Sequence, residues 1–139
     1  MRLFGTDGIR GEVGKYPLTP ENVLKLAKAS SLVLRKKNSI SRVVINKDTR
    51  LSGYMFEPAL TSGFISMGID VILVGPLPTP ALTILSKSLR ADFSVMITAS
   101  HNPYQDNGLK FFSGQGLKIS SEEENKIEDF FITTTLIIF

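Results

Sequence analysis

The polar stretch Thr98-Ala99-Ser100-His101-Asn102-Pro103 is the part of the chain best suited to chemistry. It follows a mostly apolar run at residues 93–97, and Lys110 lies downstream, within a second apolar run at residues 109–112. A serine hydroxyl is a weak nucleophile unless a base or a cation assists it. A hydroxyl at the end of a buried strand, with a cation returning to it, therefore predicts a covalent phosphoryl carrier. The alternative is an ordinary turn, because Ser and Asn-Pro are turn formers.

A second candidate is the glycine-rich segment at residues 4–11, which contains Asp7 and Arg10. Glycines let backbone amides approach an anion closely, and the planar guanidinium of an arginine can bind two phosphate oxygens at once. The alternative is a glycine-rich turn with a surface salt bridge between Asp7 and Arg10. Asp48 and Arg50 follow a short β-branched run. They allow a supporting role or, alternatively, a helix-capping aspartate beside a solvated arginine.

Helices and strands alternate along the chain. The patterns predict helices at about 20–37, 52–67 and 80–88, capped by Thr19, Ser52 and Thr79, and a final helix whose capping box joins Ser120 to Glu123. They predict strands at 42–46, 69–74 and 93–97, and the strand at 69–74 is apolar enough to be covered on both faces. We expect a three-layer α/β/α domain with a mainly parallel, mixed sheet of about four strands. Ligands of such sheets bind beyond the carboxyl ends of the strands, here at residues 47–50 and 98–101.

Composition narrows the class of protein. The 139 residues suffice for one domain, and the absence of cysteine excludes disulfides and thiolate chemistry. A single histidine argues against a histidine zinc site. The net charge of +3 suits phosphorylated metabolites and is too small to indicate nucleic acid. No run of residues resembles a signal sequence or a membrane span, so we expect a cytoplasmic protein that does not associate with membranes.

The end of the chain departs from this pattern. Residues 130–139 are apolar, uncharged and rich in residues that favour strands. They allow a final strand or a dimer-contact segment. The interpretation that we favour is a chain cut short of its natural continuation.

Five segments in order resemble the first domain of the α-D-phosphohexomutases. They are Phe-Gly-Thr-Asp-Gly-Ile-Arg-Gly, Lys-Asp-Thr-Arg-Leu-Ser-Gly-Tyr-Met, Gly-Pro-Leu-Pro-Thr-Pro, Thr-Ala-Ser-His-Asn-Pro and Asp-Asn-Gly-Leu-Lys-Phe-Phe. The resemblance covers residues 1 to about 129, so that residues 1–129 are expected to form a domain of the phosphohexomutase domain I type. The form of the first segment is typical of the bacterial phosphoglucosamine mutase branch.

The resemblance implies a role for each matching residue. Ser100 matches a phosphoserine, whose phosphate is one ligand of a Mg²⁺ ion, and His101 matches a neighbour of that phosphate. Lys110 and Arg10 match the basic residues that transfer protons, stabilise charge and, with Asn102, bind substrate. Asp7, Asp48 and Arg50 match residues that support the serine loop. The implied substrate is a phosphorylated hexosamine. Glucosamine 6-phosphate and glucosamine 1-phosphate would be interconverted, with glucosamine 1,6-bisphosphate as the primer.

The family has further domains that these 139 residues do not match. Its aspartate-rich loop supplies the other Mg²⁺ ligands, and no Asp-x-Asp-x-Asp spacing occurs here. We therefore expect weak or absent Mg²⁺ binding and no turnover by the isolated domain. One alternative is a folded remnant without catalytic activity, or a dimerisation module that forms a homodimer. Another keeps the chemistry and changes the sugar, as in a phosphomannomutase or a phosphoglucomutase.

Overall fold

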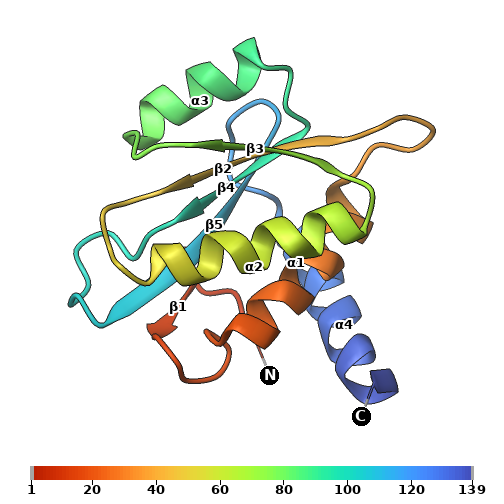
Figure 1. Cartoon of the computed structure of the whole chain (residues 1–139). Helices are drawn as coiled ribbons and strands as arrows, with labels where there is room; N and C mark the ends of the chain where they lie inside the picture. Colours follow the sequence, from red (N-terminus) through yellow and green to blue (C-terminus); the bar gives the residue numbers. More distant parts are fainter. Residues whose placement is uncertain (1, 139) are drawn as a thin grey trace.

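The computed structural model describes residues 2–138, and the side-chain surroundings of residues 2–133. Helices and strands alternate from β1 to β4, and β5 and the final helix follow (Figure 1). The elements are β1 (Ile9–Glu12), α1 (Pro20–Leu34), β2 (Arg42–Lys47), α2 (Gly53–Ser66), β3 (Asp70–Val74), α3 (Thr79–Ser88), β4 (Phe93–Ile97), β5 (Asp106–Ser113) and α4 (Ser121–Ile138). This order confirms the predicted α/β class.

The sheet has five strands in the order β1-β5-β4-β2-β3, so the expectation of about four strands is wrong by one. Strand β2 pairs in parallel with β3 and β4, whereas β5 runs antiparallel to both β4 and β1. Four strands therefore share one direction, and the sheet is mainly parallel but mixed, as predicted. Neither β1 nor β5 is among the three strands predicted by range. Strand β5 contains the apolar run at residues 109–112, whereas β1 lies in the glycine-rich segment and pairs Ile9 with Leu109.

The sheet separates two apolar clusters, which gives the three layers. Helices α1, α2 and α4 lie on one side of the sheet and α3 lies on the other (Figure 1). Successive side chains of a strand point to opposite faces. In β2, Val43 and Ile45 accordingly join the large cluster, whereas Val44 joins the smaller one with Leu82 and Met96. Strand β3 is an edge strand whose Leu73 is 50% exposed, so the prediction that both of its faces are covered is wrong.

Two of the predicted helix caps are formed and two are not. The Thr19 hydroxyl accepts a hydrogen bond from the Asn22 amide at 3.3 Å. At the start of α4, the Glu123 amide donates to the Ser120 hydroxyl at 3.1 Å, and the Ser120 amide donates to the Glu123 carboxylate at 3.0 Å. The side chain of Ser52 makes no capping hydrogen bond, because its hydroxyl instead accepts from Asn107. Helix α3 begins at Thr79 itself, so Thr79 is not its cap.

Predicted helix ends were less accurate. Helix α1 ends at Leu34, three residues before the predicted end at residue 37. Helix α2 ends as expected before Gly68, which has a left-handed φ of 77°. Helix α4 continues through Ile138, so the strand allowed for the end of the chain is wrong over residues 130–138. The suggested dimer contact and the proposed cut of the chain fall partly outside the described residues and stay predictions.

The packing of α2 against α1 requires a glycine at position 63. A Cβ atom added there would lie 2.5 Å from the Ala27 Cβ and 2.7 Å from the Leu24 carbonyl oxygen. We expect Gly63→Ala to lower the free energy of unfolding by about 1–3 kcal/mol, because overpacking forces the two helices apart. Urea unfolding of this chain measures the change. Ser62→Ala, on the exposed side of the same helix, is the matched control. Equal stability of the two variants would contradict the packing.

Candidate functional site

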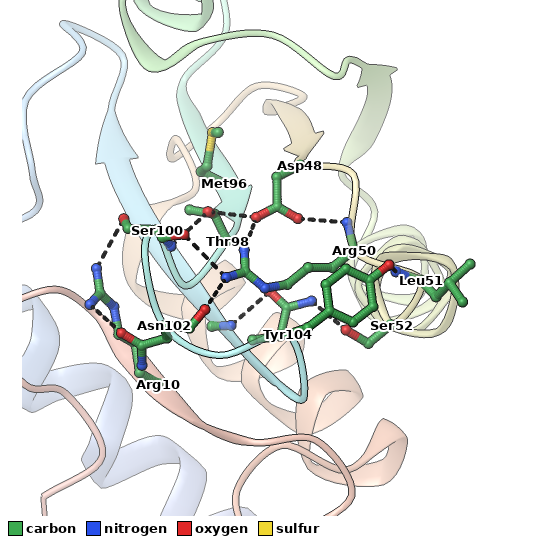
Figure 2. Close-up of polar contacts among 12 residues, drawn as sticks. Arg10, Asp48, Arg50, Leu51, Ser52, Met96, Thr98, Ser100, Asn102 and Tyr104 are labelled. Atoms are coloured by element: carbon green, nitrogen blue, oxygen red, sulfur yellow. Dashed lines mark hydrogen bonds and ion pairs between the residues drawn. The ribbon is translucent and has the colours of Figure 1, made fainter.

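Two loops begin side by side at the carboxyl edge of the sheet. Strands β2 and β4 are parallel neighbours, and their last residues, Lys47 and Ile97, are paired. Asp48 and Thr98 follow directly, so the loops that begin there meet (Figure 2). The Asp48 amide donates to the Ile97 carbonyl at 3.1 Å, and the Thr98 amide donates to the Gly108 carbonyl at 3.0 Å. The fold therefore brings three separate motifs of the sequence to one edge.

Arg10 and Lys110 project from one face of the sheet. Arg10 is paired with Gly108, and Lys110 lies two residues further along the same strand. Side chains two residues apart, and side chains of paired residues, point to the same face. Lys110 is also paired with Met96, which belongs to the apolar cluster on the α3 side. Both cations therefore lie on the face that carries α3, near the carboxyl end of β4.

The Ser100 hydroxyl lies between these two cations. Its Oγ atom accepts hydrogen bonds from Arg10 Nη2 at 3.1 Å and from Lys110 Nζ at 3.2 Å. Ser100 is exposed and has a φ of 52°, in the left-handed region that costs a residue other than glycine about 1–3 kcal/mol. Such strain persists only where neighbouring groups fix the backbone. Two cations beside an exposed oxygen can stabilise negative charge on a group attached to that oxygen.

Arg10 also connects this oxygen to the rest of the loop. Its Nη1 atom donates to Asn102 Oδ1 at 3.4 Å (Figure 2). The same atom lies 3.8 Å from the Asp7 carboxylate. The Asn102 side chain in turn donates to the Asp106 carboxylate at 3.3 Å. The predicted salt bridge between Asp7 and Arg10 is thus present, but it does not replace the contact to Ser100. The Asp7 side chain is 60% exposed, so its ion pair with Arg10 contributes little to stability.

The loop after β2 holds the serine loop in place. Arg50 forms an ion pair with Asp48 and donates from Nη2 to the Ser100 carbonyl at 3.1 Å and to the Asn102 carbonyl at 2.9 Å. Arg50 is only 7% exposed, so the alternative of a solvated arginine is wrong. The Asp48 carboxylate also accepts from the Arg50 amide at 3.0 Å and from the Thr98 hydroxyl at 2.8 Å. The position of this loop fits the supporting role expected for both residues.

Of the four residues predicted to be catalytic, His101 is the one that makes no hydrogen bond with the other three among the described residues. Its side chain is exposed and, among the residues that the structure describes, has no hydrogen bond or ion pair. Ser100, Lys110, Arg10 and Asn102 are joined by direct contacts, and Asp7, Asp48 and Arg50 surround them. The chemical roles of all these residues stay predictions.

Sequence reasoning missed several residues that join the two loops. The Thr98 hydroxyl bonds both Asp48 and the Ser100 amide. The Tyr104 hydroxyl accepts from the Leu51 amide at 3.3 Å, and the buried Asn107 side chain donates to Ser52 at 2.7 Å. The signal available was the position of Thr98 as the first residue after a buried strand. Nothing in the sequence indicated the partners of Tyr104 and Asn107.

A cavity of about 240 Å³ lies beside Lys110 and offers room for a small ligand. It is lined by residues of the glycine-rich segment, by Lys110 and Lys118, and by Phe111. Gly8 is essential to this wall, because its φ is 80° and a Cβ atom would lie 2.3 Å from the Leu109 carbonyl oxygen. The same atom would lie 3.2 Å from Lys110 Cγ. A side chain at position 8 would therefore clash with the β5 backbone and press against the lysine that contacts Ser100.

The site does not by itself suit a metal ion. Within residues 2–138, no three His, Cys, Asp or Glu side chains gather to hold one. The nearby Asp48 carboxylate is already bonded to Arg50 and Thr98. Mg²⁺ requires near-octahedral oxygen ligands, and the groups that contact Ser100 Oγ are cations. The residues described here therefore do not build the Mg²⁺ site that the family resemblance implies. No helix among these residues has the length and apolar character needed to cross a membrane.

Comparisons with known proteins agree on one family. Residues 1–136 match the model of the phosphoglucomutase/phosphomannomutase α/β/α domain I. The chain is 56% identical over 128 residues to a phosphoglucosamine mutase of Lawsonia intracellularis and 60% identical over 127 residues to one of Rhodospirillum centenum. These matches cover 92% and 91% of this chain but only 28% and 27% of the relatives.

A solved structure gives the same result for the fold. A phosphoglucomutase/phosphomannomutase family protein of Burkholderia thailandensis superimposes with a TM-score of 0.83 at 28% identity. The superposition covers 96% of this chain and 30% of that protein. The chain therefore spans rather more than a quarter of the length of these three proteins.

Proposed function

Because this chain belongs to the phosphoglucomutase/phosphomannomutase family, as its α/β/α domain I, we propose that Ser100 carries a phosphoryl group between two positions of a sugar phosphate. The observation that carries the proposal is the double contact of Ser100 Oγ with Arg10 at 3.1 Å and Lys110 at 3.2 Å. Phosphoryl transfer depends mainly on alignment and on cations around the oxygen charge. Here Arg10 and Lys110 supply the cations, and their hydrogen bonds align the exposed Ser100 hydroxyl.

The proposed reaction has two balanced transfers. In the first, the bond between phosphorus and Ser100 Oγ breaks while a sugar hydroxyl bonds to phosphorus, and the proton of that hydroxyl passes to Ser100 by way of Lys110. The sugar bisphosphate then reorients. In the second, Ser100 Oγ bonds to the other phosphorus and the bond to its sugar oxygen breaks, while the serine proton returns to that oxygen through Lys110. Arg10 stabilises the oxygen charge in both transfers.

We propose a phosphorylated hexosamine as the substrate, with glucosamine 6-phosphate converted to glucosamine 1-phosphate and glucosamine 1,6-bisphosphate as the primer. The names of the relatives from Lawsonia intracellularis and Rhodospirillum centenum support this choice. Because those relatives are far longer than this chain, turnover is proposed for a full-length protein carrying this domain, and the isolated chain is expected to be inactive. Mg²⁺ would need ligands from outside the described residues, so no step above passes through it. A cytoplasmic location and a homodimer stay predictions.

Substrate turnover tests this proposal. The 139-residue chain and the full-length protein are each supplied with Mg²⁺ and primer, and glucosamine, glucose and mannose 6-phosphates are compared in parallel. We expect the full-length protein to prefer glucosamine 6-phosphate and the isolated chain to convert none of the three. Preference for mannose or glucose phosphate would replace the proposed sugar. The absence of turnover of any sugar by the full-length protein would reject the reaction.

A separate prediction concerns the planar guanidinium of Arg10, whose two terminal nitrogens contact different residues. Lysine keeps the charge but lacks the planar fork whose Nη2 and Nη1 atoms contact Ser100 and Asn102 separately. We expect Arg10→Lys to lower kcat about 10- to 100-fold, corresponding to the roughly 1.5–3 kcal/mol contributed by a hydrogen bond to a charged group. Steady-state turnover of the full-length protein measures it, and Arg35→Lys at the exposed end of α1 is the control. Equal kcat values for the two variants would show that charge alone suffices.

A further inference from the structure

We propose that Thr98 is a positioning residue, whose hydroxyl fixes the backbone of Ser100 so that the serine oxygen faces its two cations. The inference rests on the proposed function of Ser100. Thr98 is 7% exposed and follows β4 directly. It does not contact Ser100 Oγ among the hydrogen bonds of the described residues, so it would act through the backbone (Figure 2).

The direction of both Thr98 hydrogen bonds is determined by their partners. An ionised carboxylate only accepts, so the Thr98 hydroxyl must donate its proton to Asp48 Oδ2 at 2.8 Å. A backbone amide only donates, so the Ser100 N–H must donate to Thr98 Oγ1 at 3.0 Å. One hydroxyl thus satisfies both groups. A methyl group in its place would leave the Ser100 amide without this partner and would remove one donor from Asp48.

Ser100 is consequently held at both of its backbone polar groups. Thr98 accepts from its amide, and Arg50 donates to its carbonyl at 3.1 Å. Asp48 connects the two residues that hold the Ser100 backbone, because its carboxylate accepts a hydrogen bond from Thr98 and forms an ion pair with Arg50. These bonds explain how Ser100 keeps its left-handed φ of 52°. The side-chain direction of a residue follows from its backbone, so releasing the amide is expected to move Oγ away from Arg10 and Lys110.

The same bond determines what can bind a phosphate on Ser100. Because the Ser100 amide already donates to Thr98, it is not free to donate to the oxygens of a phosphoryl group on Ser100. The charge of the phosphoryl group is then left to the side chains of Arg10 and Lys110. Loss of the Thr98 hydroxyl should therefore slow transfer without weakening the binding of the sugar.

Two variants separate positioning from packing. Thr98→Val keeps the shape of the side chain and removes the hydroxyl, whereas Thr98→Ser keeps the hydroxyl and removes the methyl group. Thr61→Val, on α2, is the matched control, because it also removes a hydrogen-bonded threonine hydroxyl, one that donates to the Glu57 backbone carbonyl at 2.7 Å. In the full-length protein, we expect Thr98→Val to lower kcat about 10- to 100-fold with KM changed less than about twofold. Thr98→Ser should keep most of the wild-type kcat.

Amide hydrogen exchange provides a readout that does not depend on activity. In the wild-type protein, the Ser100 amide should exchange slowly although the residue is exposed, and Thr98→Val but not Thr98→Ser should abolish that protection. An unprotected Ser100 amide in folded wild-type protein would overturn the inference, even if Thr98→Val failed to fold. Wild-type kcat in Thr98→Val would also overturn it.

The inference and the proposed function fail in different ways. If Ser100→Ala is inactive while Thr98→Val has wild-type kcat, the positioning role is wrong and the proposed function stands. If Ser100→Ala keeps its activity, the proposed function is wrong. The hydrogen bond between Thr98 and the Ser100 amide then has no role in catalysis.

Discussion

Replacing Ser100 by alanine is expected to abolish the isomerisation of hexosamine phosphate. The variant removes the oxygen that accepts and donates the phosphoryl group, and it leaves Arg10 and Lys110 without their shared acceptor. Removal of a covalent nucleophile lowers kcat by about 10⁴-fold or more. Because Ser100 is exposed, the free energy of unfolding should change little. Primed turnover of glucosamine 6-phosphate by the full-length protein measures the effect.

Ser39→Ala is the control for this variant, since Ser39 is an exposed loop serine far from the site in the sequence. It should have wild-type kcat. A Ser100→Ala protein that still transferred phosphoryl groups to sugar would show that another residue is the carrier. A parallel circular dichroism spectrum establishes whether both variants are folded.

Lys110→Ala should produce the second largest effect. A positioned acid or base contributes about 10²- to 10⁴-fold to the rate, and the lysine ammonium lies 3.2 Å from Ser100 Oγ. We expect kcat to fall within that range while the fold is retained, because Lys110 is only partly buried. Lys110→Arg separates the contribution of the positive charge of Lys110 from its contribution to proton transfer. Arginine keeps the positive charge but does not release a proton at ordinary pH, so a role in proton transfer predicts that it will not restore kcat.

The matched control is Lys126→Ala, which removes an exposed lysine that pairs with Glu122 on α4. Its kcat should equal that of the wild-type protein. Full recovery of kcat in Lys110→Arg would show that Lys110 supplies charge rather than proton transfer. Normal turnover by Lys110→Ala would remove Lys110 from the mechanism.

The alternation of helices and strands could be predicted from the sequence because each element has its own local signal. These signals act over only a few residues. They are the apolar periodicity, the Thr19 cap and the capping box of Ser120 and Glu123, and the capping hydrogen bonds are present in the structure. Strand β1 has no such signal. Residues 9–12 contain a single apolar side chain, Ile9, and become a strand only because β5 pairs with them.

The arrangement of the site was predictable only in part. The rule that ligands bind at the carboxyl edge of parallel strands selected the segments that meet there. The burial of Arg50 could not be foreseen, since an arginine is normally solvated. It is buried here because Asp48 and two carbonyl groups of a distant loop satisfy its guanidinium. The left-handed backbone of Ser100 likewise depends on contacts between the loops rather than on its neighbours in the sequence.

The most direct test of the central claim is to locate the phosphoryl group. The full-length protein is incubated with Mg²⁺ and glucosamine 1,6-bisphosphate labelled in its phosphates, and the modified residue is identified by peptide mass spectrometry. The account predicts one labelled phosphoryl group, on Ser100, which unlabelled glucosamine 6-phosphate then removes at the rate of turnover. A label on another residue, or a label on Ser100 that the sugar phosphate does not remove, would contradict it.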